Sequence, residues 1–155
     1  MTETIADRLK AKGVTLPEAA APAANYLPYA ISGSTLYISG QLPLEGGKLA
    51  VLGHLGKDVD ITAGQRAAEL CAINILAQAK AALGGDLERI GRLVKISGFV
   101  ASAPDFVSQH LVINGASNFF AEVLGERGKH ARAAVGMASL PLNAAVEIEA
   151  VIEIA

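Results

Sequence analysis

Residues 131–154, ARAAVGMASLPLNAAVEIEAVIEI, contain two stretches that alternate in character, Ala131–Ser139 and Ala145–Ile154. Such alternation is typical of β-strands, because successive side chains of a strand point to opposite faces. In the second stretch every even-numbered residue is apolar, and glutamates fill three of the odd positions. We therefore expect two strands joined at Leu140–Asn143, the second with one buried face.

The spacing of these strands gives a first expectation for a functional residue. If Leu142 and Asn143 form a hairpin turn, paired residue numbers sum to 285, and Arg132 shares a face with Glu147, Glu149 and Glu153. The other residues of its strand are small or apolar, which leaves room for a ligand whose carboxylate matches the guanidinium fork. The spacing alone equally allows a structural ion pair between Arg132 and one of the glutamates.

The rest of the chain predicts an α+β fold in which one sheet has two helices packed on a single face. Gly33-Ser34 suits a type II′ hairpin turn. Thr62 followed by Gln65 resembles a capping box at a helix start, and Gly84-Gly85 is a stop signal. The predicted elements are a helix over residues 2–12, a connection over Thr15–Asn25, strands Leu27–Ser32 and Thr35–Ser39, a short strand Lys48–Leu52, helix Ala63–Leu83, strand Leu93–Val100 and helix Asp105–Leu124.

Length and composition predict one domain over residues 1–155, with a helix and connection in 1–25 and the core in 26–155. Hydrophobic residues make up 52% of the chain, more than a small domain easily hides, which favours an oligomer. The lone Cys71 lies on the apolar stripe of its helix and is expected in the core. No apolar run reaches membrane-spanning length, and no secretory signal is evident, so we expect a cytoplasmic protein with no membrane partner.

Several common sites are not supported by the sequence. The three histidines are far apart, outside any metal-ligand spacing, and the Gly-flanked His54 and His130 are expected in solvated loops. Neither Gly-Gly pair fits a phosphate-binding loop or a dinucleotide fingerprint, and no G-x-S-x-G is present. A net charge of −2 with scattered basic residues argues against a nucleic-acid partner.

The closing stretch resembles the signature of the Rid/YjgF family, namely an arginine, an alternating strand, Leu-Pro, and a strand with Glu-x-Glu-Ala. The likeness covers roughly residues 26–155, and the helix near the N-terminus with the longer Val107–Asn114 stretch is similar to a less-studied branch of the family. Further matching pieces are Pro28-Tyr29, Ser39-Gly40-Gln41-Leu42-Pro43, Asp58-Val59, the helix at Thr62, Asp105-Phe106 and Asn114.

This resemblance implies a chorismate-mutase-like fold, assembled as a homotrimer with clefts between subunits. It also implies cofactor-free and metal-free hydrolysis of 2-aminoacrylate-type imines and enamines to 2-oxo acids and ammonia. Arg132 would hold the carboxylate of the small 2-imino or 2-oxo acid, and Glu147, with Glu149 as its alternative, would orient or deprotonate water. The implied pocket residues are Tyr29, Ser39, Gly40 and Asn114.

One departure from the family pattern keeps other functions open. Ala133 and Ala134 stand where family deaminases often have Ser and Cys. A non-catalytic trimer that binds small carboxylate metabolites is therefore an alternative. An endoribonuclease or translation inhibitor, a label that some relatives have, is expected last, because the sequence shows no basic stripe, stacking platform or histidine pair.

Overall fold

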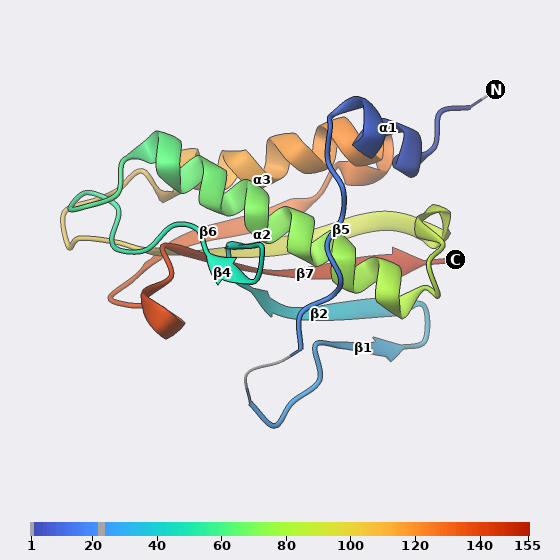
Figure 1. Ribbon diagram of the computed structural model, residues 1–155, viewed down its shortest axis with the longest axis horizontal. Coiled ribbons are helices and arrows are strands. Elements are labelled where there is room, and N and C mark those ends of the chain that lie inside the picture. Colours follow the sequence, from blue (N-terminus) through green and yellow to red (C-terminus); the bar gives the residue numbers. More distant parts are fainter. Residues whose placement is uncertain (1, 22–23) are drawn as a thin grey trace.

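A five-stranded mixed sheet forms one layer of the protein, and the helices form the other (Figure 1). The computed structural model describes residues 2–21 and 24–155. The strand order is β1-β2-β7-β5-β6, in which only β5 and β6 run parallel. The strands of this sheet are β1 (Tyr29–Ser32), β2 (Thr35–Gln41), β5 (Ile90–Ala101), β6 (Ala131–Met137) and β7 (Val146–Ile154).

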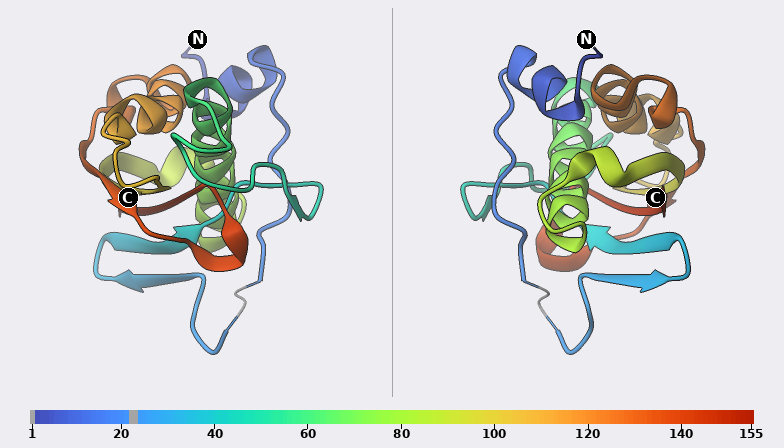
Figure 2. Two further views of the ribbon diagram at one scale, coloured as in Figure 1. Left: turned by 90° about the vertical axis from the view of Figure 1, so that its left-hand side faces the viewer. Right: turned by 90° about the vertical axis from the view of Figure 1, so that its right-hand side faces the viewer.

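Both long helices, α2 (Ile61–Ala82) and α3 (Gln109–Leu124), cover the same face of the sheet, as predicted (Figure 2). A third helix, α1 (Ile5–Ala11), joins this layer beside α3 and buries Ile5 and Leu9. Its N-terminus is a capping box made by Thr4 and Asp7. The smaller elements are a hairpin of β3 (Leu44–Glu45) and β4 (Lys48–Leu49) and the short helices η1 (Leu87–Arg89), η2 (Gly125–Gly128) and η3 (Pro141–Asn143).

The predicted pairing of the last two strands is wrong. β6 is an edge strand paired in parallel with β5, whereas β7 lies at the centre of the sheet between β2 and β5. The predicted turn does exist, because Leu142 and Asn143 both have positive φ and the amide of Ala144 donates to the carbonyl of Pro141. However, it lies within a longer connection that moves the chain from the edge of the sheet to its centre. β6 instead follows α3 in a β5–α3–β6 crossover, the usual link between parallel strands.

The hairpin of β1 and β2 has the predicted two-residue turn, with Gly33 at φ 59°. Further along β2, Ile38 pairs with Ala150 and Gln41 pairs with Ile148, so two residues of β2 oppose Glu149 alone. Ser39 and Gly40 therefore form a β-bulge. Bulges bend a strand and re-aim its side chains, and they are frequent beside functional sites.

The helix starts differ from the sequence prediction. α2 begins at Ile61, and the carboxylate of Asp60, not the side chain of Thr62, caps it by accepting from Ala63. Gln65 is not part of a capping box; it donates to the carbonyl of Leu111. α3 starts at Gln109 instead of at residue 105. The stops at Gly84-Gly85 and Gly125 are confirmed by their positive φ values.

The core lies between the helices and the inner face of the sheet. The even-numbered residues of β7 from Val146 to Ile152 are buried, as predicted, and Cys71 is also fully buried in this core. Strands Tyr29–Ser32, Lys48–Leu49 and Ala131–Met137 are shorter than predicted, and Ile90–Ala101 is longer. Of the predicted connection over Thr15–Asn25, residues 22–23 lie outside the described residues.

Candidate functional site

Arg132 lies on β6, with its side chain on the helix-covered side of the sheet. Its partner in the register, Ile96, is buried, and the guanidinium reaches α3. Nη1 donates to Oγ of Ser117 and Nη2 donates to the carbonyl oxygen of His110, each over 3.0 Å. Within residues 2–21 and 24–155, no carboxylate lies within ion-pair distance of this guanidinium. Two neutral acceptors thus hold Arg132 while its charge is not neutralised.

His130 extends this hydrogen-bond network. Nε2 of His130 lies 2.9 Å from Oγ of Ser117, and Nδ1 lies 2.6 Å from the carbonyl oxygen of Gly128. His130 lies in a loop, as predicted, but it is half-buried instead of fully solvated. The same holds for His54, whose Nε2 lies 2.7 Å from the carbonyl oxygen of Ala138. The short loops around both histidines fold back onto the body of the protein, which a Gly-flanked sequence does not reveal.

Glu147 lies on β7 on the opposite, outer side of the sheet. Its neighbour is the bulge residue Gly40, where an added Cβ would stand 2.6 Å from Oε2 of Glu147. Burial raises the pKa of Glu147 above its ordinary value, and the negative charge of Glu149 raises it further. Glu149 is exposed on the same face. A base is most effective when its pKa approaches the operating pH, and the raised pKa moves Glu147 in that direction.

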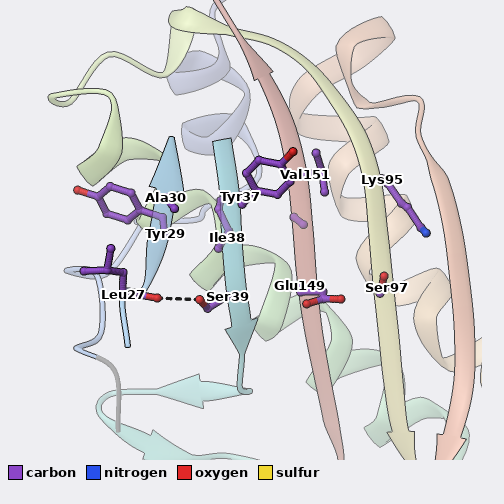
Figure 3. Close-up of a pocket in the computed structure, with 11 residues that line it drawn as sticks. Leu27, Tyr29, Ala30, Tyr37, Ile38, Ser39, Lys95, Ser97, Glu149 and Val151 are labelled. Atoms are coloured by element: carbon purple, nitrogen blue, oxygen red, sulfur yellow. Dashed lines mark hydrogen bonds between the residues drawn. The ribbon is translucent and has the colours of Figure 1, made fainter. Parts of the chain in front are cut away.

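A cavity of about 270 Å³ opens on the outer side of the sheet, where Glu149 is among the lining residues and Gly40 and Glu147 are not (Figure 3). Ser39, Ser97 and Glu149 line it from three strands, and the hydroxyl of Ser39 donates to the carbonyl of Leu27 over 2.7 Å. Tyr29 also borders the cavity, although its ring points away from Glu149. The bulge thus brings Ser39 and Gly40 next to the two glutamates.

The structure divides the predicted site residues into two groups. Tyr29, Ser39, Gly40 and Glu147 lie around β1, β2 and β7, whereas Arg132 and Asn114 lie at the β6 edge, with Asn114 on the same face of α3 as Ser117. The prediction that Arg132 and Glu147 share a face is wrong. They are on opposite faces, and β6 and β7 are two strand positions apart, about 10 Å.

The contacts of Ser117 and the backbone of His110 with Arg132 were not predicted from the sequence. A weak signal exists in the sequence, since His110, Asn114 and Ser117 recur at spacings of four and three residues and so share one side of a helix. This side of the helix meets an arginine on β6 only because of the β5–α3–β6 crossover. A hairpin of the last two strands was predicted instead, and so the sequence did not place the helix beside Arg132.

Two further observations concern the described part of the chain. It contains no group of three His, Cys, Asp or Glu side chains placed to hold a metal ion. None of its helices is long and apolar enough to cross a membrane.

Comparison with known proteins agrees with the fold and the sequence signature. Residues 6–154 match the family described as "YjgF/chorismate mutase-like, putative endoribonuclease". The chain belongs to the YjgF family. Protein TCP17 of Trypanosoma cruzi is 48% identical over 97% of this chain and 94% of its own length.

Two solved structures are similar to this chain. Atu1372 from Agrobacterium tumefaciens is 66% identical, with a TM-score of 0.92 over 97% of this chain and 92% of its own. TdcF from E. coli, crystallised with bound serine, is 26% identical, with a TM-score of 0.60 over 90% of this chain and 93% of its own. The YjgF fold of the present chain is thus shared with a protein whose structure contains an amino acid.

Proposed function

We propose that the protein is a homotrimer that hydrolyses reactive 2-imino and enamine acids to 2-oxo acids and ammonia in clefts between subunits. The observation that supports this proposal most directly is Arg132, an immobilised guanidinium without an acidic partner among the described residues. Such a group matches the carboxylate common to these substrates.

A shared site between subunits explains how the predicted residues are divided. In one chain, Arg132 lies on the edge strand β6, whereas Glu147 lies on the central strand β7 and Gly40 on the neighbouring strand β2. A head-to-tail ring would place the β6 edge of one subunit against the β1–β2 side of the next, and a ring that closes after three copies is a trimer. The outer sheet face also exposes apolar side chains, including Tyr37 and Val135, that subunit contact would bury.

The reaction follows from the two groups. Arg132 binds the substrate carboxylate and fixes the imine carbon relative to the neighbouring subunit. Glu147, whose pKa is raised by burial, accepts a proton from water as the water oxygen attacks the imine carbon. Returning that proton to the imine nitrogen gives a carbinolamine. Transfer of the carbinolamine's hydroxyl proton to its amino nitrogen, again through Glu147, then breaks the C–N bond, releases ammonia and leaves a 2-oxo acid. Tyr29, Ser39, Gly40 and Asn114 shape the pocket around the water and the substrate.

The bound serine in TdcF supports the ligand class, because serine has the amino and carboxylate groups of a 2-amino acid. The reaction needs no cofactor in this scheme. A cytoplasmic location would place the enzyme where such imines form, in line with the expectation from sequence.

Ala133 and Ala134 support a second candidate, a trimer that binds small carboxylates without turning them over. Neither side chain beside Arg132 on β6 supplies a nucleophile or an acid. RNA cleavage, which the family description mentions, has less support, because the chain has a net charge of −2 and no basic stripe.

The test is oxo-acid formation coupled to a threonine dehydratase. We expect Arg132→Ala to abolish acceleration of imine hydrolysis and Arg66→Ala to retain it, because Arg66 lies exposed on α2 in a surface ion pair. Turnover by Arg132→Ala at the wild-type rate contradicts the mechanism. Binding of 2-oxobutyrate by calorimetry without any turnover by the wild type favours the non-catalytic alternative.

Mixed trimers test whether two subunits share the site. Arg132→Ala and Glu147→Gln chains are each expected to be inactive as homotrimers. When they are co-expressed and mix at random, three quarters of the rings regain one intact site of three, so activity returns to about one quarter of wild type. No recovery in purified mixed rings argues against a shared site.

A further inference from the structure

Arg132 is the start of a hydrogen-bond chain that ends on a backbone carbonyl. Its Nη1 donates to Oγ of Ser117, which lies 2.9 Å from Nε2 of His130. Nδ1 of His130 in turn lies 2.6 Å from the carbonyl oxygen of Gly128. Neither Ser117 nor His130 was among the predicted site residues.

Only one arrangement of protons satisfies this chain when the imidazole is neutral. The carbonyl oxygen of Gly128 can only accept, so Nδ1 of His130 has the ring proton and Nε2 is an acceptor. Nε2 then receives the hydroxyl proton of Ser117. The lone pairs of Oγ are left to accept from Arg132, whose guanidinium can only donate. Every link thus has one donor and one acceptor.

Packing fixes the far end of the chain. Gly128 is buried, and a Cβ there would overlap the carbonyl oxygen of Phe120, so this residue sits directly against the end of α3. The ring of His130 meets the ring of Phe120 edge-on, with centroids 6.1 Å apart and planes at 76°. The imidazole is therefore held on two sides before it contacts Ser117.

We propose that Ser117 and His130 are positioning residues that hold Arg132 in its ligand-binding orientation. The proposal rests on the function proposed above, in which Arg132 binds the substrate carboxylate. Ser117 and the carbonyl of His110 engage one N–H on each terminal nitrogen, and three of the five guanidinium N–H groups are left for a ligand. Ordering a long side chain before the ligand arrives reduces the entropy lost on binding.

The first test is the affinity for 2-oxobutyrate, measured by calorimetry on the intact protein. Ser117→Ala removes one of the two hydrogen bonds that order Arg132, so that the ligand must order this side chain on binding, and we expect roughly a two- to tenfold loss of affinity. Ser117→Thr keeps the hydroxyl and is expected to retain most of the affinity. Ser108→Ala is the matched control, because Ser108 precedes α3 and its side chain makes no capping hydrogen bond. In the imine assay, KM should rise more than kcat falls, since the carboxylate is held alike in ground and transition states.

A double mutant separates positioning from general damage to the fold. His130→Phe keeps an aromatic ring against Phe120 but removes both nitrogens, and we expect roughly a threefold loss of affinity, because Ser117 remains. If His130 acts through Ser117, the double variant binds no more weakly than Ser117→Ala alone. The proposal is overturned if the losses of affinity in the two single variants add up in the double variant. It is also overturned if 2-oxobutyrate binds Ser117→Ala as tightly as it binds the wild type.

A measurement without ligand separates this proposal from the proposed function. Nitrogen NMR of the Arg132 side chain is expected to resolve the two Nη signals in the wild type and to show them averaged by rotation in Ser117→Ala. That result supports positioning even if 2-oxobutyrate binds to no variant, an outcome that would overturn only the proposed function. Identical Nη signals in the wild type and Ser117→Ala overturn the positioning role.

Discussion

Substituting Gly40 by alanine is expected to displace the proposed base while the carboxylate anchor stays in place. A Cβ at Gly40 would stand 2.6 Å from Oε2 and 2.8 Å from Cδ of Glu147, whereas real Cβ atoms are essentially never closer than 3.0 Å to such neighbours. The carboxylate must therefore retreat by at least about 0.4 Å. Gly40 has no positive φ, so the backbone itself tolerates alanine.

The size of the effect follows from this displacement. A misplacement of about 1 Å can lower a rate by about a hundredfold, and a positioned base contributes about 10²–10⁴-fold. We expect Gly40→Ala to lower kcat of imine hydrolysis by about tenfold to a hundredfold. The affinity for 2-oxobutyrate should change less than kcat, because Arg132, and not Glu147, holds the carboxylate of this ligand in the proposed site.

The assay is dehydratase-coupled oxo-acid formation, with calorimetry for binding. Gly91→Ala is the matched control: Gly91 is also a strand glycine, but its nearest added contact is 3.2 Å, to the carbonyl of Glu153. A crystal structure of Gly40→Ala would report the position of the Glu147 carboxylate. Wild-type kcat together with a displaced carboxylate would refute the role of Glu147 as base.

Three further predictions concern stability and reactivity. Because burial raises the pKa of Glu147 above its ordinary value of 4.5, the stability that this group contributes is present below pH 4.5 and is lost as pH rises through the folded pKa. Glu147→Gln should therefore melt at a higher temperature than the wild type near neutral pH, and the difference should vanish towards about pH 4. Calorimetric scans measure this, and a difference in melting temperature that is constant with pH would contradict it. In Gly115→Ala, the added Cβ would overlap the carbonyl oxygen of Gln65 where α2 and α3 cross. Urea unfolding should therefore show a free energy of unfolding that is lower by about 1–3 kcal/mol than that of the wild type. A gain in stability would rule out this close approach. Cys71 is fully buried, and this burial, with a smaller effect of the charge of Glu147, holds the pKa of its thiol well above the ordinary value. The thiol should not react with Ellman's reagent until the protein is unfolded in guanidinium. Rapid reaction of the native protein would show that the core opens.

The sequence predicted those features that depend on local pattern. The alternation in Val146–Ile154 identified the buried face of β7, and the stripe through Cys71 identified the inner side of α2. The pair Gly84-Gly85 predicted the end of α2, and both glycines there adopt the positive φ that this stop signal requires. In each case the residues that determine the feature lie within one or two turns of one another.

The errors concern relations between distant segments. Leu142 and Asn143 adopt a tight turn, yet this local feature does not decide which strand pairs with which. Once β6 pairs with β5 instead of β7, the face occupied by Arg132 changes. Its contacts with Ser117 and His110 could not be predicted, because they require the crossover that lays α3 beside β6. The separation of Arg132 on the edge strand β6 from Glu147 on the central strand β7 has the same origin.

The central position of β7 determines when the sheet can be completed during synthesis. β7 follows the other four strands in the chain, yet it separates them into two pairs, β1–β2 and β5–β6. A nascent chain that ends before residue 146 lacks the strand that joins β1–β2 to β5–β6, so β2 and β5 have no partner on one side and can recruit strands from other molecules. Release of the segment 146–154 from the ribosome closes both edges at once, so a chain terminated shortly before it is expected to aggregate instead of folding in part.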